Sequence, residues 1–231
     1  MGGEIPVRIL LAAATPIETA LIRRRLRLDD KSAVGGKVIN HAIREVRLIH
    51  TGIGMVNTAI HLTSAIKDEK PDLLINLGIA GAFSKSIAIG SVVEVGEDAY
   101  PELGAESGQS KLSLVEMGFE LMQTSFGPVY NRLRNPMSFP KLAAVQTVPG
   151  ITVNRIHGEE RSIREVLAAW NPHVETMETA AVFQTCLTFD VPFRCFRGIS
   201  NHVERRNRGR WQIGRAAESV QRFVLEWIRG F

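Results

Sequence analysis

The chain has 231 residues, of which 45% are apolar and 23% charged. That length and composition fit one globular domain with a sizeable core and argue against a disordered or fibrous chain. The formal net charge of +4 at pH 7 is too small to indicate a nucleic-acid or membrane partner on its own. No apolar stretch approaches the roughly 18–20 residues of a membrane span, and the two cysteines stand apart without a CxxC motif. We therefore expect a soluble, cytoplasmic protein with buried free thiols.

Buried strands and helices alternate in the first half of the chain. Residues 7–14 form a continuous apolar run, which is typical of a strand covered on both faces. Thr15, Pro16 and Glu18 follow with the spacing of a helix N-cap, an N1 proline and a capping-box glutamate. We therefore expect a helix from this point to about residue 28.

The same succession of strand, turn and helix is predicted next. A second strand is expected over residues 46–50, and the glycine-rich residues 51–54 lead from it into a helix that stops before Pro71. The apolar face of this helix is expected to carry Val56, Ala59, Ile60, Thr63 and Ile66.

The remaining elements are predicted with one long gap. A third buried strand is expected over residues 73–77, with a glycine turn over 78–81, and a fourth strand over 91–95. Residues 100–140 show no sustained period, and we expect irregular structure with short helices there. Beyond them the chain predicts strands over 143–148, 151–153 and 193–199, and helices over about 178–189 and 213–228.

This alternation predicts one α/β domain over residues 1–231, built as a three-layer α/β/α sandwich around a mostly parallel or mixed twisted sheet. In such folds the ligand binds beyond the carboxyl ends of the strands. Four segments that follow strands are therefore expected to converge on one site, namely residues 14–18, 51–57, 78–83 and 197–201.

The turn at residues 52–57 also resembles the glycine-rich turn of a dinucleotide-binding domain. It does not follow the first strand, however, and residues 76–78 lack the acidic side chain that binds the ribose in such domains. The sequence gives this alternative little support.

Four short segments, each weakly informative alone, occur in a characteristic order. They are Thr51-Gly52-Ile53-Gly54 with Asn57, residues 76–82 (NLGIAGA), residues 177–181 (METAA) and residues 197–201 (RGISN). Together they resemble the superfamily of purine nucleoside phosphorylases and methylthioadenosine/adenosylhomocysteine nucleosidases, and within it the futalosine hydrolases. The resemblance covers most of the chain apart from residues 100–140. It implies a nucleoside phosphorylase-like fold, no metal or organic cofactor, a small purine nucleoside as ligand, and a dimer or larger homo-oligomer with residues 100–140 near its interface.

Hydrolysis of a ribosyl–purine bond needs a carboxylate for the water, a partner for the sugar hydroxyls and a hydrogen-bonding group at the base, because the sugar gains oxocarbenium character. The resemblance assigns Glu18 to water activation, although the capping box alone also explains a glutamate there. It assigns Glu178 to the ribose hydroxyls and Met177 to the sugar ring, although any acid is favoured in the first turn of a helix.

The base is expected to be read by Asn201, where methylthioadenosine nucleosidases carry an aspartate. An amide cannot protonate the purine N7 as an acid, but it can donate N–H to a 6-oxo group, so Asn201 favours hypoxanthine or guanine over adenine. Arg197 is expected to support the strand-end turn of Asn201. The other predicted substrate contacts are Ile53, Ile79, Ala80, Gly81 and Ile156.

The nucleophile is expected to be water. Related phosphorylases hold phosphate with arginines in two of these turns, and here residues 14–18 and 78–83 contain neither Arg nor Lys. The resemblance therefore implies cleavage of futalosine to hypoxanthine and dehypoxanthine futalosine, a step of menaquinone synthesis. The alternatives are a methylthioadenosine/adenosylhomocysteine or aminofutalosine nucleosidase, a purine nucleoside phosphorylase, and a nucleoside- or RNA-binding module without catalysis.

A dense run of arginines precedes the last helix, at Arg205, Arg206, Arg208 and Arg210. No aromatic residues are interleaved as in a single-stranded nucleic-acid site, so we expect no nucleic-acid or membrane partner. The run is either a solvated turn or the source of an arginine that pairs with the benzoate of futalosine, a role open also to Arg132 and Arg134. Residues 154–157 are expected to hold the purine ring, without the aromatic side chain that is frequent there in the family.

Overall fold

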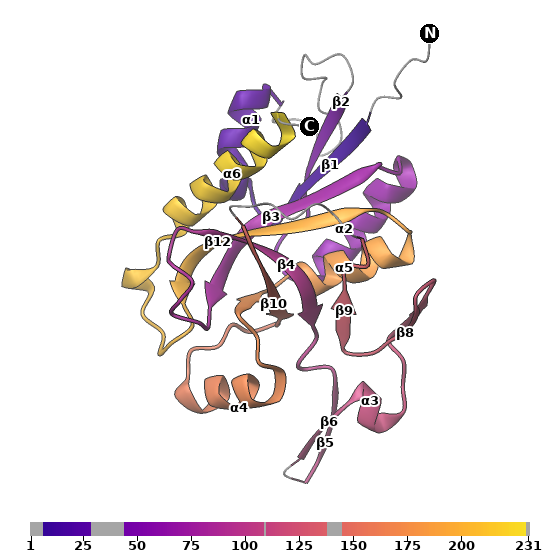
Figure 1. Cartoon of the computed structure of the whole chain (residues 1–231), viewed down its shortest axis with the longest axis vertical. Coiled ribbons are helices and arrows are strands. Elements are labelled where there is room, and N and C mark those ends of the chain that lie inside the picture. The colour runs from indigo at the N-terminus through magenta and orange to yellow at the C-terminus, as the bar shows by residue number, and fades with distance from the viewer. Residues whose placement is uncertain (1–6, 29–43, 109, 138–144, 230–231) are drawn as a thin grey trace.

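The computed structural model describes residues 7–28, 44–108, 110–137 and 145–229, and its ribbon is shown in Figure 1. The first half contains β1 (Val7–Ala13), the 3-10 turn η1 (Pro16–Glu18), α1 (Ala20–Leu26), β2 (Arg44–His50), α2 (Met55–Asp68), β3 (Leu73–Ala82) and β4 (Val92–Ala99). The middle contains β5 (Gly104–Ser107), β6 (Ser110–Ser113), α3 (Leu114–Met117), β7 (Met122–Thr124), β8 (Gly127–Val129) and β9 (Arg132–Arg134). The last part contains β10 (Gln146–Thr152), α4 (Glu160–Trp170), β11 (Val174–Thr176), α5 (Thr179–Thr188), β12 (Phe193–His202), η2 (Arg208–Arg210) and α6 (Ile213–Arg229).

One mixed sheet organises the fold. Its strands follow the order β11-β10-β4-β12-β3-β1-β2, with β9 beside β4, and β11 also pairs with β3 so that the sheet closes on itself. Strand β3 runs parallel to both β1 and β12, whereas β12 runs antiparallel to β4. The carboxyl ends of β1, β3 and β12 therefore lie at the same edge, as the sequence predicts for the ligand site.

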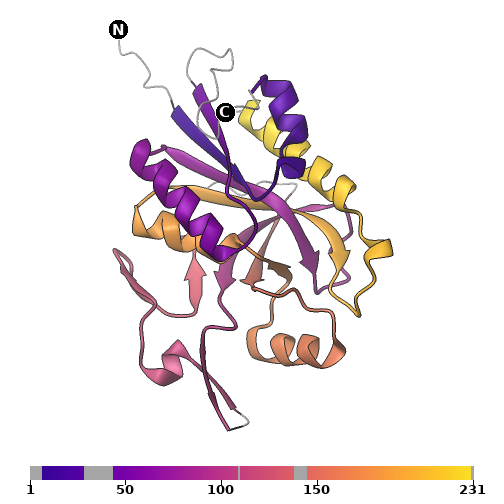
Figure 2. The ribbon, with the colours of Figure 1, turned by 180° about the vertical axis from the view of Figure 1, so that it is seen from behind.

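Helices cover both faces of this sheet. Helices α1 and α6 lie together on one face and α2 and α5 on the other, as Figures 1 and 2 show from opposite sides. Two large apolar clusters fill the two interfaces, one including Ile22 and Val224 and the other including Leu62 and Phe183. The predicted α/β/α sandwich is confirmed. Among the helices of the described residues, none combines the length and the apolarity that crossing a bilayer requires.

The predicted glycine turn over residues 78–81 is wrong, because these residues continue strand β3. Residues from Leu74 to Ala82 pair with β12, and Gly81 also pairs with Glu175 of β11. The neighbouring strand is likewise longer than predicted, since β12 extends to His202 with an irregularity in register between Ile199 and Asn201. Pairing with β12 along this segment, and with β11 at Gly81 and Ala82, supplies the backbone hydrogen bonds that hold these residues extended.

The predicted buried face of α2 is also wrong in part. Val56 is 71% exposed and Ile60 is 59% exposed. The side chains that α2 buries are Thr58, Leu62, Ala65 and Ile66. They repeat with the same helical period one position out of phase, which leaves an apolar stripe of α2 on the surface.

Residues 100–140 differ from the prediction of irregular structure with short helices. In their described part they form five short strands, β5 to β9, and the four-residue helix α3. The strand predicted over 143–148 joins that over 151–153 in the single strand β10, with residues 143–144 outside the described ranges. Helix α4 was not predicted, although its apolar side chains recur at helical spacing and Val166 packs on Ile151 and Val153.

Candidate active site

Glu18 lies at the carboxyl edge of the sheet, at the end of the 3-10 turn η1, and is only 7% exposed. Its Oε2 accepts hydrogen bonds from the backbone N–H of Thr15 at 2.8 Å and from the Thr15 hydroxyl at 2.9 Å. Its Oε1 accepts a bond from the backbone N–H of Ile79 at 3.2 Å. The predicted capping contacts are thus present, and the second oxygen reaches across to β3, where Gly78 leaves room for it.

Glu178 precedes the first residue of α5 and binds the turn after β2. Its Oε1 accepts the backbone N–H of Gly54 at 2.8 Å, and its Oε2 accepts that of Met177 at 3.3 Å. Burial raises the pKa of Glu178, an effect opposed by the Gly54 hydrogen bond and the positive charge of Arg197 and reinforced by the negative charge of Glu18. Gly54 has a φ of +94°, a conformation that favours glycine and that aims its N–H at this carboxylate.

Arg197 does not support the turn of Asn201 as predicted. Its side chain is buried, and its guanidinium donates to the side-chain oxygen of Asn76, to the Thr179 hydroxyl at 2.8 Å and to the Phe196 carbonyl at 2.8 Å. Arg197 therefore ties β3 and β12 to the first turn of α5. Its positive charge acts on Glu178, and its hydrogen bonds go to residues other than Asn201.

Asn201 faces Gly81 across the β12–β3 pair. A methyl group at Gly81 would lie 3.2 Å from Asn201 Nδ2 and 2.9 Å from Val203, so the absence of a side chain there keeps the space in front of the amide open. Asn201 Oδ1 accepts a hydrogen bond from Ser200 Oγ at 2.7 Å, and Nδ2 donates to the His202 carbonyl at 3.0 Å. The Ser200 hydroxyl has a single proton, and the Ala80 carbonyl, 3.1 Å from its oxygen, is an alternative acceptor.

A cavity of about 320 Å³ adjoins Asn201 and is rich in cationic and aromatic side chains. Its lining residues are Lys85, Ile89, His157, Asn201, His202, Glu204, Arg206, Asn207, Arg210 and Trp211. The Arg206 guanidinium stacks over the Trp211 ring at 5.3 Å. The arginine run before α6 thus contributes two side chains to the same cavity as Asn201, while Arg132 and Arg134 both form ion pairs with Glu97.

The four predicted segments therefore converge. Glu18 contacts β3 at Ile79, the backbone N–H of Gly52 donates to the Ala14 carbonyl at 3.0 Å, and Asn201 faces Gly81. The Glu178 carboxylate binds the turn beside Ile53. The side chain of Ile53 is 57% exposed, and Met177 is partly buried next to Glu178. Ile156 instead packs against the small cluster of Ile151, Val153 and Val166, so its side chain is part of a core.

Comparisons with known proteins agree with this geometry. Residues 8–229 match the model of the phosphorylase superfamily. The chain belongs to this superfamily. A curated relative, the 5'-methylthioadenosine/S-adenosylhomocysteine nucleosidase of Staphylococcus aureus (strain MRSA252), is 30% identical over 167 residues, which span 68% of this chain and 69% of the relative.

Solved structures of the phosphorylase superfamily share the fold. The native structure of futalosine hydrolase from Helicobacter pylori strain 26695 has a TM-score of 0.80 at 15% identity. The match covers 97% of this chain and 98% of the chain in that structure. The Streptococcus pneumoniae MTA/SAH nucleosidase in complex with 8-aminoadenine has a TM-score of 0.78 at 22% identity and covers 97% and 100%. The predicted superfamily and its fold are confirmed, and the predicted enzyme class agrees with the names of these relatives.

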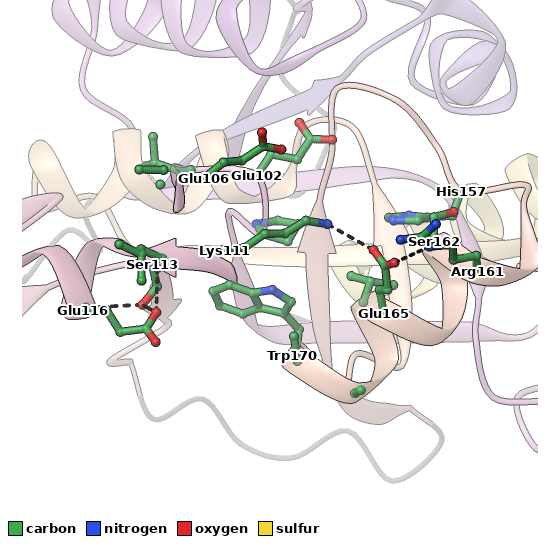
Figure 3. A pocket seen from close by; sticks show the side chains of 18 of the residues that line it. Glu102, Glu106, Lys111, Ser113, Glu116, His157, Arg161, Ser162, Glu165 and Trp170 are labelled. Carbon is green, nitrogen blue, oxygen red and sulfur yellow. Dashed lines mark hydrogen bonds and ion pairs between the residues drawn. The ribbon is translucent and has the colours of Figure 1, made fainter. Parts of the chain in front are cut away.

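Within the phosphorylase fold, a larger groove of about 1290 Å³ lies between α4 and the β5–β6 hairpin (Figure 3). Lys111 of β6 reaches across it to Glu165 of α4 at 3.2 Å, and Glu165 also pairs with Arg161. Neither Glu18, Glu178 nor Asn201 lines this groove. No group of three or more metal-ligating side chains occurs in the part of the chain that the structure describes.

One polar pair at the site of this superfamily member was not foreseen. His157 Nδ1 lies 2.6 Å from Glu175 Oε2, and the backbone N–H of His157 donates to Glu175 Oε1 at 3.0 Å. The sequence predicts that residues 154–157 hold the purine, but it singles out neither His157 nor Glu175. An acidic residue within the buried strand β11, only 4% exposed, was the available indication.

Proposed function

We propose that this chain hydrolyses the N-glycosidic bond of a purine nucleoside, with futalosine as its substrate and hypoxanthine and dehypoxanthine futalosine as products. The observation that carries the proposal is the placement of Glu18 and Asn201 at the carboxyl end of β3, with Glu178 close enough to Glu18 for their charges to interact. This grouping supplies a carboxylate for water, a carboxylate for the sugar and an amide for the base.

Glu18 is the general base in this mechanism. Its two oxygens are fixed by three donors on η1 and β3, so the carboxylate is oriented before substrate binds and has lone pairs left for a water molecule. Glu18 takes a proton from the water as the water oxygen attacks the anomeric carbon, and the bond to the purine breaks with its electron pair on the base, which takes up a proton from solvent. Orientation by backbone N–H groups lowers the reorganisation needed in the transition state.

Glu178 holds the ribose. The hydrogen bond from Gly54 and the charge of Arg197 favour the ionised carboxylate against the effect of burial, and an ionised carboxylate accepts bonds from the 2′ and 3′ hydroxyls. These bonds strengthen as the sugar becomes positive, which stabilises the transition state more than the bound substrate. Met177 packs beside the sugar in this arrangement.

Asn201 favours a 6-oxopurine, because its N–H donates to O6 and its carbonyl accepts from a protonated N7. Water is the nucleophile, since residues 14–18 and 78–83 contain no Arg or Lys for phosphate. Arg206 and Arg210 line the cavity beside Asn201. With the base bound at Asn201, these two arginines lie near the base.

The direct test is chromatography of the products formed from futalosine in phosphate-free buffer. The proposal expects hypoxanthine to appear at a rate that added phosphate does not change, and no ribose 1-phosphate. Turnover that depends on phosphate would replace the hydrolase with a phosphorylase. Binding of futalosine without any release of base would indicate a binding module.

A second candidate is a methylthioadenosine/adenosylhomocysteine or aminofutalosine nucleosidase. The 30% identity to the Staphylococcus aureus nucleosidase favours it. The two candidates differ in the group at purine C6, so parallel assays with futalosine and with methylthioadenosine separate them. A higher kcat/KM for the 6-amino substrate would overturn our assignment of Asn201.

We also propose that the enzyme acts as a homo-oligomer. Ile53 and Val56 beside the Glu178 carboxylate, together with Ile60 on α2, expose most of their side chains. Residues 103–137 expose a second group of apolar side chains, among them Val115, Phe119 and Phe126. Exposed apolar groups of this size are typical of protein interfaces.

A further inference from the structure

The buried pair of His157 and Glu175 has a defined protonation pattern. Glu175 is 4% exposed, and its two oxygens accept one hydrogen bond each from the His157 backbone and ring. An ionised carboxylate only accepts hydrogen bonds, so the His157 Nδ1 carries a proton. In the neutral ring the other nitrogen, Nε2, then presents a lone pair. Within the described residues Nε2 has no hydrogen-bond partner.

The pair lies on the opposite side of Gly81 from Asn201. Glu175 is the register partner of Gly81 in the antiparallel β11–β3 pair, and Asn201 is its partner in the parallel β12–β3 pair. Register partners direct their side chains to the same face of a sheet, so Glu175 and Asn201 flank the open space over Gly81. His157 and Asn201 line the same 320 Å³ cavity, and His157 also lines the groove of about 1290 Å³ between α4 and the β5–β6 hairpin.

This cavity therefore offers an amide donor from Asn201 and a nitrogen acceptor from His157. A 6-oxopurine in its lactam form presents the matching edge, with an acceptor at O6 and a donor at N1–H. A 6-aminopurine presents the reverse pattern, with a donor at C6 and an acceptor at N1. A base with the wrong edge leaves buried polar groups unpaired, which lowers its affinity.

We propose that His157 is a specificity residue that accepts the N1–H of a 6-oxopurine, and that Glu175 is the positioning residue that fixes its tautomer. The proposal rests on the proposed function, because it places the purine base in the cavity beside Asn201. It goes beyond it by assigning the discrimination between 6-oxo and 6-amino bases to two side chains rather than to Asn201 alone.

The experiment measures kcat/KM for futalosine and for aminofutalosine, which differ at C6, in the wild type and in two variants. For His157→Ala we expect the ratio of the two values to fall at least tenfold, through loss of futalosine cleavage. For Glu175→Gln we expect a smaller fall. The glutamine amide can either accept from or donate to Nδ1, so the ring proton is no longer fixed on Nδ1. The matched control is Glu165→Gln, which neutralises an exposed carboxylate of α4 and is expected to leave the ratio unchanged.

A second measurement gives a decisive result with the wild-type protein alone. Hypoxanthine and 1-methylhypoxanthine are compared as product inhibitors, since the methylated base lacks the N1–H. We expect the methylated base to inhibit at least tenfold more weakly in the wild type and the two bases to differ less in folded His157→Ala. Equal inhibition of the wild type by both bases would contradict the role of His157, whether or not the variant folds.

The outcomes separate this inference from the proposed function. An unchanged substrate ratio in folded His157→Ala overturns the inference and leaves the nucleosidase in place. A wild type that cleaves neither nucleoside overturns the proposed function. A wild type that prefers aminofutalosine overturns both the 6-oxo assignment and the role of His157, while leaving bond hydrolysis intact.

Discussion

Glu18 forms the capping contacts of η1, and we propose that the same carboxylate is the general base. The two roles predict different losses when its charge is removed. In Glu18→Gln the side chain keeps its size, but one of its three accepted hydrogen bonds meets an N–H group instead of an oxygen. As the general base, Glu18 accounts for a factor of about 10²–10⁴ in kcat, so we expect turnover to fall by that order while futalosine still binds. Stopped assays for kcat and calorimetry for binding measure the two effects.

The chain offers a matched control for the capping role. Ser113 and Glu116 form the same box at α3, where Glu116 Oε2 accepts the Ser113 N–H and hydroxyl, both at 2.7 Å. Glu116→Gln is expected to lower stability slightly, because the amide weakens the box, and to leave turnover unchanged. If Glu18→Gln behaves like this control, Glu18 is a capping residue and the proposed base lies elsewhere.

Asp98 predicts a pH-dependent stability. It is fully buried, its Oδ1 accepts a bond from Thr152 at 2.8 Å, and its Oδ2 has no partner among the described residues. Burial raises its pKa from 3.8 to about 7, against the hydrogen bond from Thr152 and the charge of Arg197. Between these values the folded state retains a proton that the unfolded state releases, so this group makes stability fall as pH rises from about 4 to 7.

Asp98→Asn removes that ionisation without changing the shape of the side chain. We expect the melting temperature of the variant, relative to the wild type, to increase from pH 4 to about pH 7 and to level off above it, on top of a constant loss from its unpaired amide group. Thermal unfolding monitored by circular dichroism at four pH values checks this. A difference that does not vary with pH would show that Asp98 does not titrate in this range.

At the scale of elements, local signals predicted beginnings better than ends. The apolar run of β1 and the N-cap of η1 are encoded within a few residues, and both were placed correctly. The end of β3 was misplaced because its glycine-rich residues are held by β11 and β12, which lie about 100 residues further along the chain. The pair of His157 and Glu175 depends on the same long-range pairing, whereas Glu18, Glu178 and Asn201 were predicted from short segments and from the family resemblance that these segments carry.

Gly78 shows why β3 must carry glycine where it passes Glu18. A methyl group there would lie 2.9 Å from Glu18 Oε1 and 3.8 Å from the Arg197 guanidinium carbon. In Gly78→Ala the carboxylate has to move away from the Ile79 N–H, so we expect kcat to fall at least tenfold. Steady-state kinetics measure this.

The control for Gly78→Ala is Gly214→Ala in α6, where an added methyl group meets no atom within 4 Å. Alanine in a helix gains roughly 0.5–1 kcal/mol over glycine, so this variant should be as active as the wild type and slightly more stable. Equal activity of both variants would mean that the position of Glu18 against β3 does not matter for turnover.

At the scale of the whole molecule, the exposed stripe of α2 and the exposed side chains of residues 103–137 require an explanation in one assembly. In a two-fold dimer, a contact between one patch of the first subunit and another patch of the second is repeated with the subunits exchanged. The apolar stripe of α2 on each subunit can therefore cover the exposed apolar side chains of residues 103–137 on the other. Val56 is 71% exposed and Phe126 is 72% exposed. Burial of such side chains contributes about 25 cal/mol for each Å² of apolar surface, which a charge at either position would oppose.

We therefore expect Val56→Asp and Phe126→Asp each to shift the protein from a multiple of its 25.5 kDa chain mass toward the single chain. Light scattering coupled to size-exclusion chromatography measures the mass, and Glu226→Lys on the exposed side of α6 is the control that should leave it unchanged. Because Val56 lies next to the Gly54 turn that binds Glu178, Val56→Asp should also lower kcat/KM, whereas Phe126→Asp tests whether assembly alone affects turnover. A wild type that elutes with the mass of one chain would remove the homo-oligomer from the proposal and leave the catalytic assignments untouched.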